Sequence, residues 1–263
     1  MTKKWYEKPH RVSKNKNVEM KSESDEYGLK QLHNDNREGI FIYKEKAYGR
    51  SIFRREWIDW EPKNIFDVGS YRGGDSLRFS LWFPSAQIYS FEGCPGNYEE
   101  VIKTKSLVKN MNSYNYIVSD KVEIMDFHQW QINEKDGPGT NWSGPEIRYH
   151  GSIYPPAKMV FHNFKHLSPI EKTQVQSTTI DKFCDDHQIK EIDMIHIDAE
   201  GAGYEIITGM NKILPKLIFI ERENRHLFQG KKTGDNELIK LLNNRGYKIK
   251  YSLHNDILLE KII

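Results

Sequence analysis

The chain reads Asn-Ile-Phe-Asp-Val-Gly-Ser-Tyr-Arg-Gly-Gly over residues 64–74. Asn64 to Val68 is a short, mainly apolar run typical of a buried strand, and Gly69 to Gly74 supplies a glycine-bearing turn. A helix is predicted next, over residues 75–83. In the order strand, glycine turn, helix, the free N–H groups at the start of the helix can bind a ligand that lies at the turn. The stretch therefore predicts a nucleotide-binding α/β sheet.

The glycine spacing in the turn points away from dinucleotides. The fingerprint G-x-G-x-x-G is absent, because Ser70 and Tyr71 follow Gly69 before Gly73 is reached. The carboxylate of Asp67, just before the turn, would repel a pyrophosphate. It is compatible with a cofactor that has a free ammonium and no phosphate, such as S-adenosylmethionine. The turn thus favours methyl transfer, with an ordinary glycine turn as the alternative.

A second acid supports a ribose-bearing cofactor. Glu92 follows the predicted strand 87–91 and stands 25 positions after Asp67. Dinucleotide folds place the acid that accepts the ribose hydroxyl protons near this position. An acid stabilised by a helix start is the alternative. Asp120, after a predicted third strand at 115–119, is either an adenine contact or a turn aspartate.

Titratable side chains also gather at the ends of two later predicted strands. His196, Asp198 and Glu200 stand at the end of one apolar run, and Glu221 and Glu223 follow the next. Ligands of open α/β sheets bind outside these carboxyl ends. His196 or Asp198 is the candidate general base. Asp198, Glu221 and Glu223 are candidate ligands of a divalent cation such as Mg²⁺, or alternatively surface acids, most readily Glu223.

The remaining pattern organises the chain. Residues 1–38 form a polar leader, and residues 39–263 form one domain that ends in an antiparallel hairpin. The other predicted elements are helices at 97–110, 181–187, 204–214 and 237–245, and strands at 175–180, 192–197 and 217–220.

Periodicity is lost between about 128 and 173, and this segment is predicted to form the acceptor-binding wall over the site. Its side chains offer flat faces for a sugar ring and hydrogen bonds for hydroxyls, although packing of the segment onto the domain would explain its aromatics equally well. These side chains are Trp130, Trp142, Tyr149 and Tyr154, with His150, His162 and Asn163.

Composition excludes several classes of protein. In 263 residues, 39 Lys and Arg nearly balance 37 Asp and Glu, so there is no global charge to attract nucleic acid. The two cysteines, Cys94 and Cys184, support neither a disulfide framework nor a zinc site. No stretch has the length of a membrane span or a signal peptide, so a cytoplasmic protein is predicted. The oligomeric state stays open.

At these residues the chain resembles the FkbM family of S-adenosylmethionine-dependent methyltransferases over roughly residues 64–225. The matching residues are Asp67-Val68-Gly69 with Gly73 and Ser76, Ser90-Phe91-Glu92 with Pro95 and Asn97, Val118-Ser119-Asp120, Thr179-Ile180-Asp181, Ile197 to Gly201 with Glu205 and Gly209, and Glu221.

The resemblance implies a class I, Rossmann-like methyltransferase sheet of seven mostly parallel strands, and O-methylation of a hydroxyl on a sugar, glycan or related small molecule. The cofactor residues that it implies, with the rest of the turn, are Asp67, Gly69, Ser70, Tyr71, Gly73, Ser76, Glu92, Ser119, Asp120 and Asp198. The candidate catalytic residues are His196, Asp198, Glu200 and Glu221. Two positions depart from the family pattern. His196 stands where the family commonly has lysine, and Ser70-Tyr71-Arg72 stands where Ala-Asn and a small residue are usual.

Other functions remain open at this point. The first is a magnesium-assisted O-methyltransferase, and the second is a non-catalytic module that binds the cofactor or a partner. RNA methylation is a further alternative, although no aromatic and basic recognition motif accompanies the near-neutral charge.

Overall fold

A computed structural model describes residues 22–24, 30–33, 39–43, 46–51, 53, 55–132, 149–158, 167–169, 172–222, 226, 228–253 and 256–262. Its internal contacts divide the chain into two compact units, Met1–Arg54 and Arg55–Ile263. The boundary lies after the one expected at residue 38, because the strands at 39–51 pair with strands that precede them.

The first unit contains a four-stranded antiparallel sheet, and two of its strands fall within the predicted polar leader at 1–38. Its strands are β1 (Ser22–Ser24), β2 (Lys30–His33), β3 (Gly39–Tyr43) and β4 (Lys46–Ser51).

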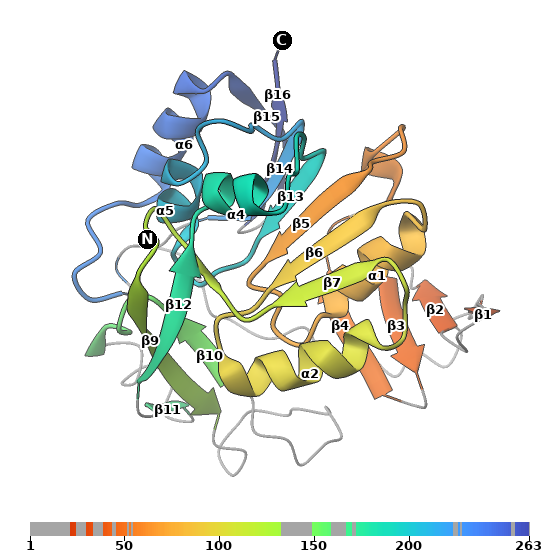
Figure 1. The fold of residues 1–263 in the computed structure, drawn as a ribbon, viewed down its shortest axis with the longest axis horizontal. Helices are drawn as coiled ribbons and strands as arrows, with labels where there is room; N and C mark the ends of the chain where they lie inside the picture. The colour runs from red at the N-terminus through yellow and green to blue at the C-terminus, as the bar shows by residue number, and fades with distance from the viewer. Residues whose placement is uncertain are drawn as a thin grey trace, which may run out of the picture. The chain divides into compact units, whose positions relative to one another are not determined.

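The second unit is built on a seven-stranded sheet in the order β15-β16-β14-β13-β5-β6-β7 (Figure 1). The strands are β5 (Asn64–Val68), β6 (Gln87–Phe91), β7 (Met111–Tyr114), β13 (Met194–Ile197), β14 (Leu217–Glu221), β15 (Tyr247–Leu253) and β16 (Asp256–Lys261). Pairing from β14 through to β7 is parallel, and β16 runs antiparallel to both of its neighbours. The predicted parallel sheet with a terminal antiparallel hairpin is confirmed.

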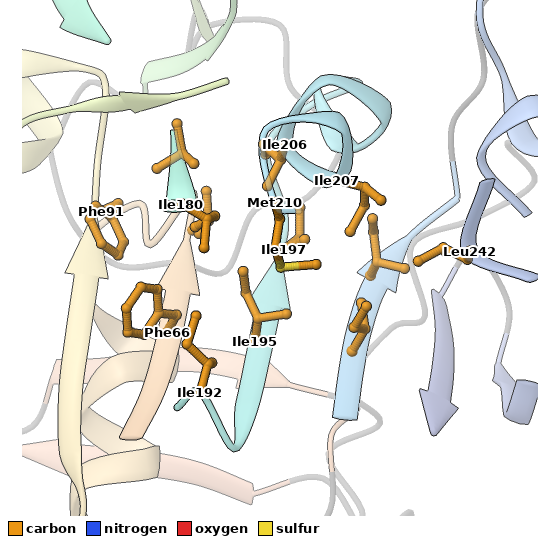
Figure 2. Packing of buried hydrophobic residues seen from close by; sticks show 14 of the residues in the cluster. Phe66, Phe91, Ile180, Ile192, Ile195, Ile197, Ile206, Ile207, Met210 and Leu242 are labelled. Atoms are coloured by element: carbon orange, nitrogen blue, oxygen red, sulfur yellow. The ribbon is translucent and has the colours of Figure 1, made fainter. Parts of the chain in front are cut away.

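Alternation along the strands separates the two faces of this sheet. Ile195 and Ile197 of β13 join a large apolar cluster, whereas His196 between them lies on the opposite face with Phe79. Figure 2 shows the cluster, in which sheet side chains such as Phe66 meet side chains of the covering helices. Burying each such side chain contributes about 1.5–3 kcal/mol.

Three helices supply the apolar cluster, and two others lie elsewhere on the sheet. The first three are α4 (Ile180–Asp186), α5 (Gly203–Thr208) and α6 (Asp235–Asn244). On the opposite face, α1 (Gly74–Trp82) brings Phe79 to His196, and α2 (Pro95–Lys105) contacts α1 and β7.

Helix α5 ends earlier than the predicted residue 214 for a visible reason. The carboxylate of Asp181 accepts the backbone N–H groups of Asn211 and Lys212 at 2.9 and 3.0 Å, which diverts them from helical bonding. Gly209 caps the helix where a Cβ would lie 2.2 Å from the carbonyl oxygen of Ser119.

A second sheet corrects two predictions. It contains β8 (Ile117–Val118), β9 (Ile124–Ile132), β10 (Tyr149–Ser152), β11 (Leu167–Pro169) and β12 (Thr173–Thr178). The predicted strand at 115–119 is therefore wrong as a strand of the main sheet, where Met111–Tyr114 takes that place. The prediction of irregular chain over 128–173 was wrong at β9, β10 and β11, whose polar and aromatic residues lack a clean alternation.

Within the part of the chain that the structure describes, no helix has both the length and the apolar character required to cross a membrane.

Candidate active site

The turn after β5 touches the turn after β13. Gly69 has a φ of +81°, and a Cβ at this position would lie 2.0 Å from the carbonyl oxygen of Asp198. The Asp198 N–H donates to the carbonyl of Val68 at 2.9 Å. Only glycine allows this approach in this conformation. The predicted cofactor turn and a predicted catalytic acid therefore meet.

The start of α1 lacks a side-chain cap. Its N-cap, Gly73, has a φ of 79° and no side chain to cap the helix, and the first-turn amides have no acceptor within the helix. The buried Oγ of Ser70 has no hydrogen-bond partner among the described residues. An amino-acid carboxylate suits such a helix start. Tyr71, with a φ of 54°, and Arg72, whose guanidinium lies 5.3 Å from the Tyr71 ring centre, complete the turn.

Glu92 links the same turn to the end of β6. Its Oε2 accepts the N–H of Tyr71 and its Oε1 accepts the N–H of Cys94, each at 2.8 Å. Burial raises the pKa of Glu92 to about 7, against the lowering effect of the bonds from Cys94, Tyr71 and Asn97. The carboxylate thus joins the turn after β5 to the turn after β6, and its contact with the cofactor ribose stays a prediction.

His196 lies in a buried ion pair beneath the turn. Its Nδ1 is 2.8 Å from Oδ1 of Asp67, a side chain with no exposure, and the Ser76 hydroxyl donates to the other oxygen of Asp67. The His196 ring stacks on Phe219 at 5.3 Å and meets Phe79 edge-on. Burial lowers the pKa of His196, but the hydrogen bond and charge of Asp67 outweigh it and raise the pKa to about 9.

Carboxylates converge at the ends of β13 and β14. Asp198 is exposed, yet the groups packed around it strip away part of its hydration, and with the charge of Glu200 they raise its pKa to about 7. Burial and the charge of Asp198 raise the pKa of Glu221, and the two side chains share a hydrogen bond. Asp256, paired with Glu221 across β14 and β16, adds to the effect. We call Asp198, Glu200, Glu221 and Asp256 the acidic cluster. One of its members holds a proton near neutral pH more readily than an isolated carboxylate does.

Two predicted adenine contacts lie beside α5. Ser119 is fully buried, and its hydroxyl donates to the carboxylate of Asp120 at 3.1 Å. Asp120 is exposed. Ser119 and Asp120 directly follow β8, which is the edge strand of the second sheet. The Ser119 carbonyl lies against Gly209 at the end of α5.

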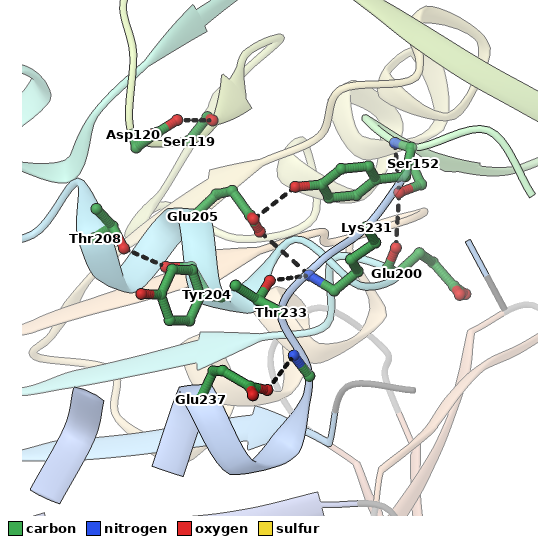
Figure 3. Close-up of polar contacts among 12 residues, drawn as sticks. Ser119, Asp120, Ser152, Glu200, Tyr204, Glu205, Thr208, Lys231, Thr233 and Glu237 are labelled. Carbon is green, nitrogen blue, oxygen red and sulfur yellow. Dashed lines mark hydrogen bonds and ion pairs between the residues drawn. The ribbon is translucent and has the colours of Figure 1, made fainter. Parts of the chain in front are cut away.

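One part of the predicted acceptor wall is described in detail. The hydroxyl of Ser152 donates to the carbonyl of Glu200 at 2.7 Å, and the hydroxyl of Tyr154 donates to Glu205 at 2.6 Å (Figure 3). Tyr154 also lies 4.9 Å from the ammonium of Lys231. Tyr154 is thus packed onto the domain, which is the alternative that the sequence left open for this residue.

Several predicted residues lie outside the described residues, namely Trp142, His162, Asn163 and Glu223, and the same holds for the side chains of Tyr149 and His150. In the described part of the chain, no group of three or more His, Cys, Asp or Glu side chains has an arrangement that could hold a metal ion.

Sequence reasoning missed Asp256 and Lys231. Asp256 belongs to the predicted terminal hairpin, and its pairing with Glu221 depends on the register between β14 and β16. Lys231 stands in a polar stretch with no periodicity, and no local signal marks it as buried.

Comparison with known proteins agrees with this geometry. The family described as the methyltransferase FkbM domain matches residues 67–249. The 2-O-methyltransferase NoeI of Sinorhizobium fredii is 27% identical over 174 residues, which cover 63% of this chain and 65% of that relative's length.

Two solved structures align with this chain at low sequence identity. Aeropyrum pernix fibrillarin, solved with S-adenosyl-L-methionine, has a TM-score of 0.46 at 10% identity, covering 94% of this chain and all of that one. The precorrin-6y C5,15-methyltransferase of Geobacter metallireducens has a TM-score of 0.41 at 12% identity, covering 79% and 86%.

Proposed function

The chain belongs to the methyltransferase FkbM domain family and is an S-adenosylmethionine-dependent methyltransferase, and from that premise we propose that it methylates a hydroxyl group of a sugar, glycan or related small molecule. A relative that carries the name 2-O-methyltransferase supports a hydroxyl acceptor. The observation that carries the proposal is the close approach of Gly69 to the backbone carbonyl of Asp198, which brings a candidate base next to the glycine turn.

The residues at the sheet edge fit the cofactor. Its carboxylate would lie at the α1 start and near the orphaned Ser70 hydroxyl, and its ribose hydroxyls would donate to Glu92. The acidic cluster suits a ligand with an ammonium and a sulfonium charge. When bound, S-adenosylmethionine supplies the methyl group and the thioether leaving group.

Asp198 is our candidate for the general base. Its carboxylate is exposed to an acceptor, and a pKa near 7 lets it take the hydroxyl proton as the oxygen forms its bond to the methyl carbon. Glu221, hydrogen-bonded to Asp198, is placed to share that proton. Glu200 raises the pKa of Asp198 by its charge.

His196 receives a different role in this proposal. Its Nδ1 is bound to Asp67, its ring is buried between aromatic side chains, and its raised pKa keeps it protonated near neutral pH. A protonated, buried imidazole is a poor proton acceptor. We assign His196 to holding Asp67 and the β5 end in place.

Two measurements test the proposal. Calorimetry with S-adenosylhomocysteine should show saturable binding, and labelled S-adenosylmethionine should transfer methyl to members of a panel of sugars and glycans. Absence of binding would overturn the cofactor assignment, and transfer only to RNA would overturn the acceptor class.

A chelator distinguishes direct proton acceptance by Asp198 from the metal-assisted alternative. In that alternative, Asp198 and Glu221 would hold Mg²⁺ against two acceptor hydroxyls. We expect transfer to continue in excess EDTA, because direct proton acceptance by Asp198 requires no cation. Loss of transfer that Mg²⁺ restores would instead establish the metal-assisted reaction.

A further inference from the structure

Lys231 is a buried cation that binding of the cofactor and acceptor does not explain. It lies between β14 and α6, and its side chain has no exposure. Its ammonium lies 3.4 Å from Oε2 of Glu205 and donates to the hydroxyl of Thr233 at 3.2 Å. A buried lysine is tolerated only where such partners replace its lost hydration.

Glu205 is the point where three segments meet. It stands in the first turn of α5, directly after the turn that carries Asp198 and Glu200. Its Oε1 accepts the hydroxyl of Tyr154 at 2.6 Å, while its Oε2 faces Lys231. One carboxylate therefore joins the wall after β10 to the segment before α6, as Figure 3 shows.

Further contacts bind the same segments to the turn after β13. Gly201 has a φ of +88°, and a Cβ there would lie 2.5 Å from the ring of Phe228. The N–H of Gln229 donates to the carbonyl of Pro155 at 2.7 Å, and the Ser152 hydroxyl donates to the Glu200 carbonyl. Ser152 and Phe228 thus both contact the turn at 198–201, whose first residue is the candidate base Asp198.

We propose that Lys231 is a positioning residue for methyl transfer, which acts through its ion pair with Glu205. The pair holds the turn at 198–201 against Gly69 and fixes Tyr154 over that turn. Removing only the cation leaves the Glu205 carboxylate in the packed contact with the Tyr154 hydroxyl but without its cationic partner, and the turn must open to hydrate it. The inference rests on the proposed function, in that it takes Asp198 to stand at the cofactor.

A double-mutant cycle tests the ion pair. We compare the wild type with Lys231→Met, Glu205→Gln and the double variant, using Lys232→Met as control because Lys232 is an exposed neighbour. Calorimetry with S-adenosylhomocysteine should show affinity lowered at least tenfold in Lys231→Met. Affinity should return to within threefold of wild type in the double variant, which carries no unpaired charge.

Amide hydrogen exchange supplies a readout that does not depend on the cofactor. Exchange at residues 198–205 and 151–158 should rise in Lys231→Met and fall back in the double variant, even if the wild type fails to bind S-adenosylhomocysteine and the proposed function fails. If Lys231→Met does not fold, the double variant and Glu205→Gln still test the charge. Two results would overturn the proposal. If the double variant is as impaired in affinity and exchange as Lys231→Met, Lys231 only fills space. If Lys231→Met keeps wild-type affinity and exchange, the ion pair does not position the turn.

Discussion

Replacing Gly69 by alanine tests whether the contact between the two turns builds the site. A non-glycine residue at a φ of +81° costs about 1–2 kcal/mol. The new Cβ would lie 2.0 Å from the Asp198 carbonyl oxygen, and real contacts do not fall below 3.0 Å, so one turn must move by about 1 Å. That shift weakens the bond from the Asp198 N–H to Val68, worth about 1 kcal/mol. We expect the free energy of unfolding to fall by roughly 2–3 kcal/mol, which is the sum of these two effects.

The same substitution should strongly lower both the rate of methyl transfer and the affinity for the cofactor product. A misplacement of about 1 Å at a catalytic group lowers a rate by roughly 10²-fold, and we expect that loss of methyl transfer together with at least tenfold weaker S-adenosylhomocysteine binding.

The chain offers a matched control for this substitution. Gly230 has a φ of +75°, and among the described residues other than its chain neighbours no atom lies within 4 Å of the position that a Cβ would take there, so Gly230→Ala carries the backbone cost without the clash. Urea unfolding and calorimetry on both variants separate the two effects. Equal losses of stability and affinity in Gly69→Ala and Gly230→Ala would refute the idea that close approach to Asp198 shapes the site.

Three further predictions concern the titratable side chains. Wild-type methyl transfer should rise with pH through about 7 as Asp198 ionises, and Asp198→Asn should lower the rate by roughly 10²-fold and abolish that rise; an unchanged profile would argue against Asp198 as base. Glu92→Gln should weaken S-adenosylhomocysteine binding by roughly 10- to 100-fold by calorimetry, because charged hydrogen bonds contribute about 1.5–3 kcal/mol, whereas exposed Glu99→Gln should not; equal affinities would contradict the ribose assignment. The pKa of His196, raised to about 9, means that its protonation stabilises the fold below about 6.5 and that this contribution, about 3 kcal/mol, is lost as pH rises through 9. The difference in unfolding free energy between wild type and His196→Gln should shrink over that range, and a pH-independent difference would count against the ion pair with Asp67.

The sequence predicted the main sheet well because its strands are short apolar runs with clear ends. β5 and β6 coincide with the predicted ranges, and the intervening helix ends at Trp82, two residues before Pro84. The third strand failed, since Met111–Tyr114 alternates polar residues and the more apolar Ile117–Val118 attracted the prediction. Its identity depends on pairing with β6, which local pattern does not encode.

In the candidate site, too, some residues could be predicted from the sequence and their surroundings could not. Asp67, near the end of β5, and Glu92 and Asp198, which directly follow β6 and β13, stand out in the sequence because acids next to buried apolar runs are unusual. Their surroundings were not predictable, because the partner of Asp67 is 129 residues away in sequence and the ion pair changes His196 from a candidate base to a buried cation. The carboxylate of Asp256 reaches Glu221 only through the hairpin register.

The distance in sequence between the two halves of the site also bears on how the protein folds during synthesis. β5, β6 and β7 form adjacent parallel strands from one continuous stretch of chain, with α1 and α2 between them, so this half-sheet can assemble early. β13, which pairs with β5, is made more than a hundred residues later. Until then the β5 edge has no partner, and the glycine turn lacks the carbonyl against which it packs. We expect the nascent chain to expose a strand edge prone to association during this interval, and to gain affinity for the cofactor only once β13 has emerged from the ribosome.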